Sequence, residues 1–258
     1  MNQSVLTTCE RRRWALGALL MALAAGCTPP GKPNPADRPV LPDEVMSFDQ
    51  LFSTNCAGCH GANGELGPAP PLNDPLFLAI IPDEDLLGVI RNGRPGTPMP
   101  PFLIDKGGSL TEKQISALIQ EMKSQWLSEA VVPESTPAYL LSKAGGVQTS
   151  PGSRQRGEQV FARACAGCHG ANGLGVDHEH STGGPINVPA FLALISDQAI
   201  RRIIITGRPD LKMPNYAETK GRPDGFQPLT SAEIDDLVAL IADWRGAGAV
   251  ARSGDQQD

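Results

Sequence analysis

The sequence predicts an all-α protein that consists of two modules in tandem, and two observations lead to this prediction. A nine-residue string, CAGCHGANG, occurs at residues 56–64 and again at residues 165–173. Each copy is followed by the same order of segments. The last of these segments has, after both copies, apolar residues spaced i, i+3, i+4 and i+7, which is the spacing of one buried helix face. We therefore expect one module at residues 46–126 and a second at residues 155–246.

The composition of the chain favours a loop-rich protein whose polypeptide core is small. The 258 residues include 28 glycines and 24 prolines, whereas aromatic residues make up only 5%. A large apolar cofactor would fill such a core. The formal net charge of -6 argues against binding to nucleic acid, because nucleic-acid-binding proteins need a basic surface.

The N-terminus carries the features of an export signal. Three arginines at residues 11–13 precede an apolar run at residues 14–25, which is shorter than the roughly 20 residues of a membrane span but suits a signal peptide. The run continues into LAAGC, which resembles a bacterial lipobox ending in Cys27. We expect a signal peptide at residues 1–26 and a lipid on Cys27 that anchors the exported protein to the periplasmic side of a bacterial membrane. The alternative is an ordinary signal peptide, in which Cys27 is incidental.

Three further segments connect or flank the modules. Residues 27–45 contain six prolines and predict an extended tether that, at ~3.1 Å per residue, reaches roughly 55 Å. Residues 127–154 are rich in Pro, Gly and Ser and predict a linker, whose apolar stretch at residues 139–141 should dock on the modules. Residues 247–258 form a polar tail.

Each module is expected to begin with a short amphipathic helix, at residues 47–55 and 156–164. A Gly- and Pro-rich loop follows the repeated string. A middle helix comes next and ends at Gly93 or Gly207, because glycine is the usual residue just past a helix end. A methionine lies six residues beyond each of these glycines, in a Pro-rich loop: Met99 and Met213.

The last helix of each module has the clearest pattern. Thr111 with Gln114, and Thr230 with Glu233, match the capping box at a helix N-terminus. Each helix should bury a stripe of four apolar residues: Ile115, Leu118, Ile119 and Met122 in the first module, and Ile234, Leu237, Val238 and Ile241 in the second.

The repeated string contains Cys-x-x-Cys-His, which is the attachment signature of c-type heme. Its two thiols, one helical turn apart, can form thioether bonds to the two vinyl groups of the porphyrin. The histidine that follows lies under the iron as its proximal ligand. Such a histidine is neutral at its coordinating nitrogen, and its other nitrogen normally donates to a carbonyl. The loop residues Pro70 or Pro71, and Pro185, are candidates to supply that carbonyl.

With these residues, the chain resembles a diheme member of the class I cytochrome c family over nearly all of residues 46–246. The resemblance implies that the helices of each module wrap around a covalent heme, so that the protein holds two hemes c. The second module departs from the family pattern by a five-residue insertion after its motif. The resemblance also implies the heme-binding residues: Cys56, Cys59, His60 and Met99 in the first module, and Cys165, Cys168, His169 and Met213 in the second, with His60, Met99, His169 and Met213 as ligands of the iron.

Two other uses of the cysteine pairs are alternatives. The four cysteines could form one zinc site, or each pair could be a redox disulfide of the thioredoxin type. The zinc site does not explain the histidine after each pair or the methionine at the same place in each module, and the sequence lacks the βαβ pattern expected of a thioredoxin-type protein. Within the insertion, His178 and His180 could bind a metal, or His178 could replace Met213 at the iron. We favour a solvated polar loop, because so Gly-rich a segment lacks the rigidity of a site.

Heme iron with histidine and methionine ligands has a raised reduction potential and no open position for a substrate. We therefore expect an electron-transfer protein, without catalytic residues, that acts between respiratory complexes at the periplasmic membrane surface. A quinol-oxidising complex or a dehydrogenase would be the donor, and a terminal oxidase or another cytochrome the acceptor. The alternative is a diheme enzyme, or a cytochrome subunit of a dehydrogenase, of the peroxidase or thiosulfate-dehydrogenase type. The thiosulfate enzymes use an axial cysteine, and outside the motifs the mature chain has only Cys27.

Overall fold

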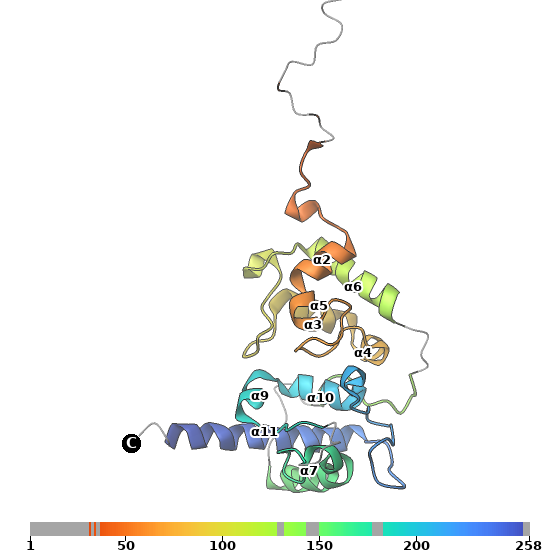
Figure 1. Ribbon diagram of the computed structural model, residues 1–258, viewed down its shortest axis with the longest axis vertical. Helices are drawn as coiled ribbons and strands as arrows, with labels where there is room; N and C mark the ends of the chain where they lie inside the picture. The colour runs from red at the N-terminus through yellow and green to blue at the C-terminus, as the bar shows by residue number, and fades with distance from the viewer. Residues whose placement is uncertain are drawn as a thin grey trace, which may run out of the picture. The chain divides into compact units, whose positions relative to one another are not determined.

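The computed structural model describes residues 31, 34, 37–127, 132–142, 150–176 and 183–254 (Figure 1). The predicted signal peptide, Cys27, His178 and His180 lie outside the described residues. The chain divides into an N-terminal unit, Met1–Glu44, and a second unit, Val45–Asp258, which contains both predicted modules. No helix in the described residues is long and apolar enough to cross a membrane.

In the N-terminal unit, the described residues contain one short 3-10 helix, η2 (Pro42–Glu44). The side chain of Glu44 accepts a hydrogen bond from Arg38 at 2.6 Å and another from the backbone N–H of Leu41 at 3.1 Å. The border after Glu44 falls within one residue of the predicted end of the tether.

The prediction of an all-α fold is confirmed, because the described residues form helices and no named strand. We refer to helices α2 to α6 as module one and to helices α7 to α11 as module two. Module one contains α2 (Phe48–Asn55), α3 (Ala57–His60), α4 (Pro75–Ile80), α5 (Asp83–Asn92), the 3-10 helix η3 (Ile104–Lys106) and α6 (Glu112–Trp126). Module two contains α7 (Pro151–Ala164), α8 (Ala166–His169), α9 (Pro189–Leu194), α10 (Asp197–Thr206), the 3-10 helix η4 (Pro209–Leu211) and α11 (Ser231–Gly254).

The middle helix of each module, predicted as continuous, is broken into two. In module one, α4 ends at Ile80, and Pro82 precedes α5 as its N-cap. A proline cannot continue the hydrogen bonding of the preceding turn, so the chain restarts in a new direction. In module two, Ser196 holds the same place and accepts from the N–H of Ala199, which starts α10. The predicted ends of the second pieces, at Gly93 and Gly207, are confirmed.

Two other boundaries differ from the prediction. Helix α7 begins at Pro151, inside the predicted linker, because Ser150 and Ser153 form a capping box and Pro151 takes the first helical position. Helix α11 continues to Gly254, into the segment predicted as a polar tail.

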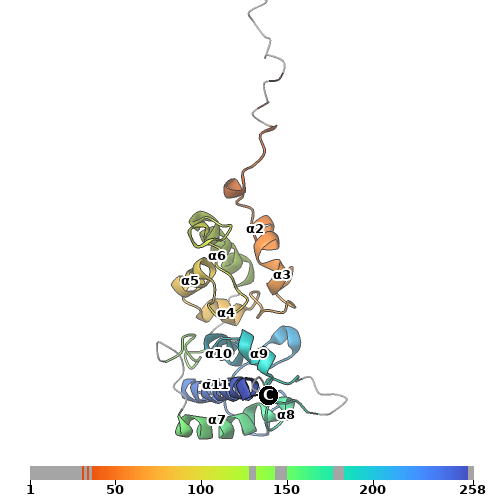
Figure 2. The same cartoon turned by 90° about the vertical axis from the view of Figure 1, so that its left-hand side faces the viewer.

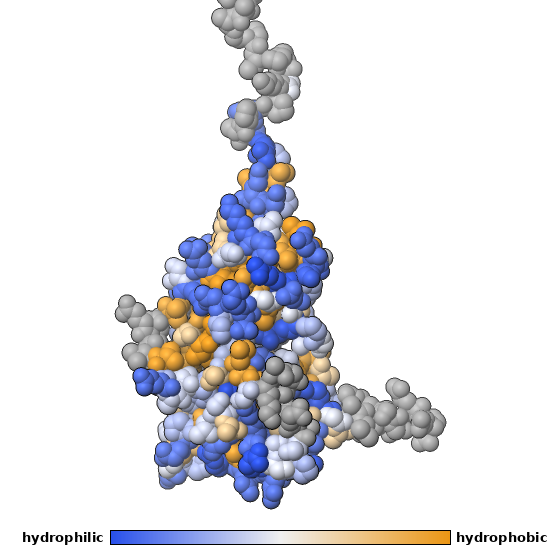
Figure 3. Space-filling view, turned by 180° about the vertical axis from the view of Figure 1, so that it is seen from behind, coloured by the Kyte–Doolittle hydropathy of each residue, from blue (hydrophilic) through white to orange (hydrophobic). Residues whose placement is uncertain are grey.

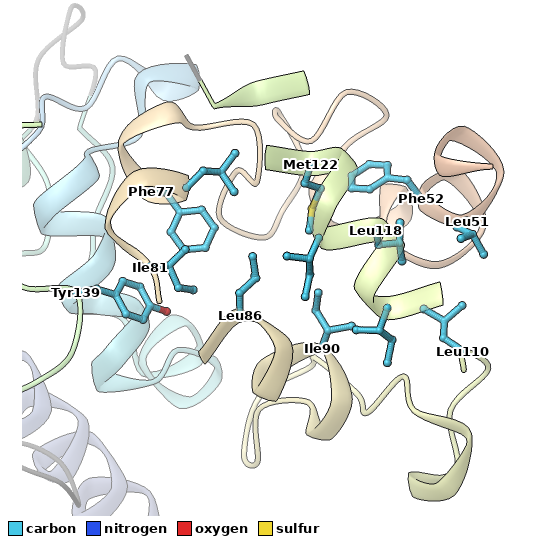
Figure 4. Packing of buried hydrophobic residues seen from close by; sticks show 13 residues of the cluster. Leu51, Phe52, Phe77, Ile81, Leu86, Ile90, Leu110, Leu118, Met122 and Tyr139 are labelled. Atoms are coloured by element: carbon cyan, nitrogen blue, oxygen red, sulfur yellow. The ribbon is translucent and has the colours of Figure 1, made fainter. Parts of the chain in front are cut away.

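The last helices form the core of each module as predicted. The capping boxes of Thr111 with Gln114 and of Thr230 with Glu233 are both present. All eight residues of the two predicted stripes are buried. In module one, Leu118 and Met122 of α6 face Phe52 of α2, with Ile81, Leu86 and Ile90 beside them (Figure 4).

Helices α7 and α11 approach closely in module two (Figure 2). Gly157 of α7 faces α11, and a Cβ atom added there would lie 2.3 Å from the carbonyl oxygen of Asp236. Arg156 of α7 donates two hydrogen bonds to the carboxylate of Asp236, each 2.7 Å long. A residue without a side chain thus allows the two helix backbones to meet.

The two modules pack on each other within the second unit. Helix α4 of module one contacts α10 of module two, and the two helices lie side by side in both views (Figures 1 and 2). Ile80 of α4 packs against the cores of both modules. The apolar stretch of the linker docks, as predicted, and it does so on both modules. Tyr139 is buried in the core of module one (Figure 4), and Leu141 packs against the core of module two.

Candidate heme sites

Each Cys-x-x-Cys-His motif folds as one short turn of helix after the first helix of its module. In module one, α3 follows Cys56, and the backbone N–H of His60 donates to the carbonyl of Cys56 at 3.0 Å. The same bond joins His169 to Cys165 at 2.9 Å in module two. The turn brings two thiols and one imidazole together within five residues, as attachment to a single porphyrin requires.

The histidine rings are oriented by backbone carbonyls. Nδ1 of His60 lies 2.8 Å from the carbonyl oxygen of Pro70, and Nδ1 of His169 lies 2.8 Å from that of Gly184. The prediction for Pro70 is confirmed, whereas the prediction for Pro185 is wrong, because Gly184 supplies the carbonyl. A carbonyl can only accept, so Nδ1 carries the proton and the lone pair of Nε2 is available to a metal.

The environment of His60 keeps its imidazole neutral. Burial lowers its pKa most, because a buried site disfavours the charged ring. The hydrogen bond to Pro70 opposes this effect, and the positive charges of Arg202, Arg94 and Arg208 lower the pKa further. A neutral imidazole is the form that binds iron.

The cysteines of the motifs are free thiols in the described structure. Burial raises the pKa of Cys56 to about 11 and that of Cys165 to about 12. Redox cysteines of the thioredoxin type have a lowered pKa, so these thiols have the opposite character. Among the described residues, no group of three or more His, Cys, Asp or Glu side chains could hold a metal ion, so the zinc alternative finds no support there.

The two methionine loops share one backbone hydrogen bond and the same glycine geometry. The N–H of Arg94 donates to the carbonyl of Met99, and the N–H of Arg208 to that of Met213, each at 3.0 Å. Gly93 and Gly207 adopt positive φ angles of 67° and 72°, and a Cβ atom there would lie 2.6 and 2.5 Å from those same carbonyl oxygens. The glycines therefore end the middle helices and also admit the loops that present the methionines.

The side chains around the motifs suit a large apolar ligand. Met99 packs, partly buried, against the core of module one, and Cys165 does so against that of module two. Large apolar residues are nevertheless exposed near the motifs: Leu66 and Leu174 in the loops after them, and Phe191 and Leu194 on α9. Figure 3 shows that apolar surface gathers in patches on one face of the molecule. Thiols, a metal-binding nitrogen and apolar surface together fit a covalently bound heme.

Sequence reasoning missed the arginines of α10. Arg201 and Arg202 are both buried, although arginine is rarely buried without a partner. A signal for them exists in the repeat. When α5 and α10 are aligned through Gly93 and Gly207, Arg201 and Arg202 take the places of Leu87 and Gly88. Module two thus has two charged residues where module one has an apolar residue and a glycine. This difference indicates that the two helices have different surroundings.

Two family models match separate parts of the chain. Residues 154–244 match the family model Cytochrome c, and residues 43–120 match the family model Cytochrome C oxidase, cbb3-type, subunit III. The cytochrome c55X of Pseudomonas aeruginosa is 35% identical over 115 residues, which are 43% of this chain and 88% of that protein.

Oxidase subunits are also similar to the chain. The cbb3-type cytochrome c oxidase subunit FixP of Sinorhizobium medicae is 31% identical over 140 residues, which are 51% of this chain and 40% of that protein. The CcoP subunit of Azospirillum sp. is 30% identical over 150 residues, covering 54% of this chain and 44% of that protein. The chain thus spans less than half the length of these two subunits.

Proposed function

Because the chain belongs to the cytochrome c family and binds two hemes c covalently, one in each module, we propose that it carries electrons between respiratory complexes at the periplasmic membrane surface. The observation that supports this proposal best is the pair of histidines whose Nδ1 atoms point at carbonyls. Each histidine would thereby offer Nε2 to an iron, and an equivalent backbone hydrogen bond holds the methionine loop of each module.

The chain's own residues have three tasks in this proposal. Pairs of cysteines would bind each porphyrin covalently, a histidine and a methionine would bind each iron, and the helices would exclude water from most of the ring. The bound heme supplies one-electron chemistry between Fe(II) and Fe(III), and a methionine ligand favours Fe(II). The proposed ligand sets are Cys56, Cys59, His60 and Met99 in module one, and Cys165, Cys168, His169 and Met213 in module two.

We propose a terminal oxidase as the partner that receives the electrons. This choice is supported by the similarity of the chain to the FixP and CcoP subunits of cbb3-type oxidases. The donor would be a quinol-oxidising complex or a dehydrogenase. A lipid on Cys27 would hold the protein close to both.

Replacement of the methionines tests the ligand sets. Met99→Ala and Met213→Ala should each remove part of the weak far-red band of Met–Fe(III) ligation and open one iron to carbon monoxide. Met46→Ala is the control, because Met46 is exposed at the start of module one and should leave both properties unchanged. If the unmodified protein binds carbon monoxide readily at one heme, that iron is open, and a catalytic heme of the peroxidase type becomes the better interpretation.

Electron transfer itself needs a separate measurement. The reduced protein should be oxidised rapidly and completely by a purified cbb3-type oxidase, with oxygen consumed in proportion. The rate should fall with increasing salt if opposite charges guide the two proteins together. If the oxidase does not accept electrons and another periplasmic cytochrome oxidises the protein rapidly, the direct electron acceptor is a cytochrome and not a terminal oxidase.

A further inference from the structure

We propose that Arg202 of module two is a positioning residue for the histidine ligand of module one, and that its buried charge raises the reduction potential of the heme in module one relative to module two. This inference rests on the function proposed above, because it takes His60 as a ligand of the iron. One module would thus control the heme of the other.

Two neighbouring carbonyls connect Arg202 to His60. The carbonyl oxygen of Pro70 accepts the hydrogen bond from Nδ1 of His60. The next carbonyl along the chain, that of Pro71, accepts a short hydrogen bond from Nη2 of Arg202. Arg202 therefore holds the loop that holds the imidazole, and residues at this second step normally orient the ligand and tune its metal.

Arg202 also stacks on module one. Its guanidinium carbon lies 3.4 Å from the centroid of the Phe77 ring, which is the geometry of a cation–π contact. Asp74 is the N-cap of α4, and its Oδ1 accepts a hydrogen bond from the backbone N–H of Phe77. The guanidinium is thus fixed between the ring of α4 and the loop of the histidine ligand.

The charge of Arg202 persists in this buried place. The residue is only 5% exposed, and burial lowers its pKa to about 10, so it stays protonated at neutral pH. Tyr139 and Asp74 favour the charged form and raise this pKa, while the positive charges of Arg94 and Arg208 lower it. Positive charge near an iron disfavours Fe(III) relative to Fe(II), so a buried arginine held beside the loop of His60 would raise the potential of that heme.

Arg201, the neighbour of Arg202, fixes α10 in position. Its Nε and Nη2 atoms donate to the carbonyl of Ala138 in the linker, at 3.0 and 2.7 Å. Its Nη1 pairs with Asp235 of α11 at 2.6 Å. Helix α10 is therefore anchored on both sides. The Arg202 side chain, which extends from it into module one, has little conformational freedom.

The arrangement is one-sided. Gly88 of module one takes the position of Arg202, and a Cβ atom added there would meet nothing within 4 Å. Phe191, the counterpart of Phe77, is 40% exposed, whereas Phe77 is 2% exposed. No arginine of the described residues stacks on Phe191. The charge should therefore act on one heme and create a potential difference within the chain, along which one electron passes from the iron of module two to that of module one.

Redox titration of the full-length diheme protein tests the proposal. Arg202→Gln should lower the potential of module one and leave that of module two in place. The equilibrium constant for electron exchange between the hemes should change by about tenfold, or about 59 mV for a one-electron couple. The two steps of the titration are assigned with Met99→Ala, which alters module one only. Arg202→Lys keeps the charge and should shift the potential less than Arg202→Gln does.

Two variants serve as controls. Gly88→Arg adds an arginine at the equivalent place in module one. It should leave both potentials nearly unchanged, because nothing lies within 4 Å of an added Cβ atom and solvent and salt screen an exposed charge. Arg201→Gln removes a buried arginine whose charge is balanced by Asp235. It should lower the stability of the protein without shifting the reduction potential of one heme relative to the other. If Arg202→Gln folds but moves neither potential, or moves both equally, the proposal is wrong. If Arg202→Gln does not fold, a small selective shift of the module one potential in Arg202→Lys supports the proposal, and a loss of stability without any selective shift, as in Arg201→Gln, overturns it.

These outcomes are distinct from failure of the proposed function. If the wild-type protein contains one heme, or if His60 is not an iron ligand, the function itself is wrong, and absorption spectra of the wild type reveal it. If both hemes have the expected ligands and only the effect of Arg202 is absent, the function stands and the inference falls.

Discussion

Gly157 offers a direct test of how module two is packed, through the substitution Gly157→Ala. A new Cβ atom would lie 2.3 Å from the carbonyl oxygen of Asp236 and 2.9 Å from Cβ of Leu240. Carbon and oxygen atoms in contact ordinarily stay about 3.3 Å or more apart. Helices α7 and α11 would therefore have to separate by about 1 Å, and overpacking of this kind costs about 1–3 kcal/mol.

A second glycine gives the matched control. Alanine ordinarily stabilises a helix interior by about 0.5–1 kcal/mol relative to glycine. Gly88 lies inside α5 with nothing within 4 Å of an added Cβ atom, so Gly88→Ala should show this gain alone. For Gly157→Ala, the same gain is outweighed by the clash. We expect a net loss of about 1 kcal/mol or more in the free energy of unfolding.

Urea unfolding of the heme-loaded protein measures both effects. Circular dichroism reports the helices, and heme absorbance reports the heme environment. The midpoint should fall for Gly157→Ala and rise for Gly88→Ala, with the dependence on urea unchanged. Equal gains in the two variants would show that α7 and α11 do not meet at Gly157, and the account of this contact would then be wrong.

Three further predictions concern the cofactor, the anchor and one ion pair. An alkaline pyridine spectrum of the denatured protein should report two hemes per chain, and the double substitution of Cys165 and Cys168 by Ala should leave one; heme that acid acetone extracts would contradict covalent binding. Cys27→Ala should release heme-loaded protein from the membrane into the periplasmic fraction, and an unblocked mature N-terminus elsewhere would exclude the anchor. Asp210 accepts two hydrogen bonds from Arg208, and these bonds hold the pKa of Asp210 below its ordinary value near 3.8. The contribution of Asp210 to stability is therefore present at neutral pH and is lost as the pH falls below about 4. Asp210→Asn should therefore lower the urea midpoint at pH 7 by a larger amount than at about pH 2, and an equal loss at both values would argue against this origin.

The features that the sequence predicted correctly are local in the chain. A capping box joins residues three apart, and a buried stripe repeats every three or four residues. Thr111 and Ile115 therefore predict α6 from the local sequence alone. The heme motif is also local, because its five residues fold within one turn. The all-α class and the position of each last helix follow from such short-range patterns.

The features that the sequence did not predict depend on distant partners. Arg202 and the carbonyl of Pro71 are 131 residues apart, and no spacing rule connects them. The acceptor for His169 is Gly184, which takes the place of Pro70 when the modules are aligned through Gly93 and Gly207, so the proline at 185 was a misleading signal. The breaks at Pro82 and Ser196 also carry local signals, because proline and serine favour a new helix start and an acidic residue follows each of them. The prediction of one continuous middle helix overlooked these signals.

The linker between the modules has a consequence for anyone who wishes to produce one module by itself. A chain that stops near residue 130 lacks Tyr139, whose ring belongs to the core of module one and touches Phe77 at a centroid distance of 6.0 Å. A chain that begins near residue 145 lacks Ala138, whose carbonyl receives two hydrogen bonds from the buried Arg201. Either cut therefore creates a defect in the piece that it isolates, and a sound fragment of module one and a sound fragment of module two must both include residues 132–142.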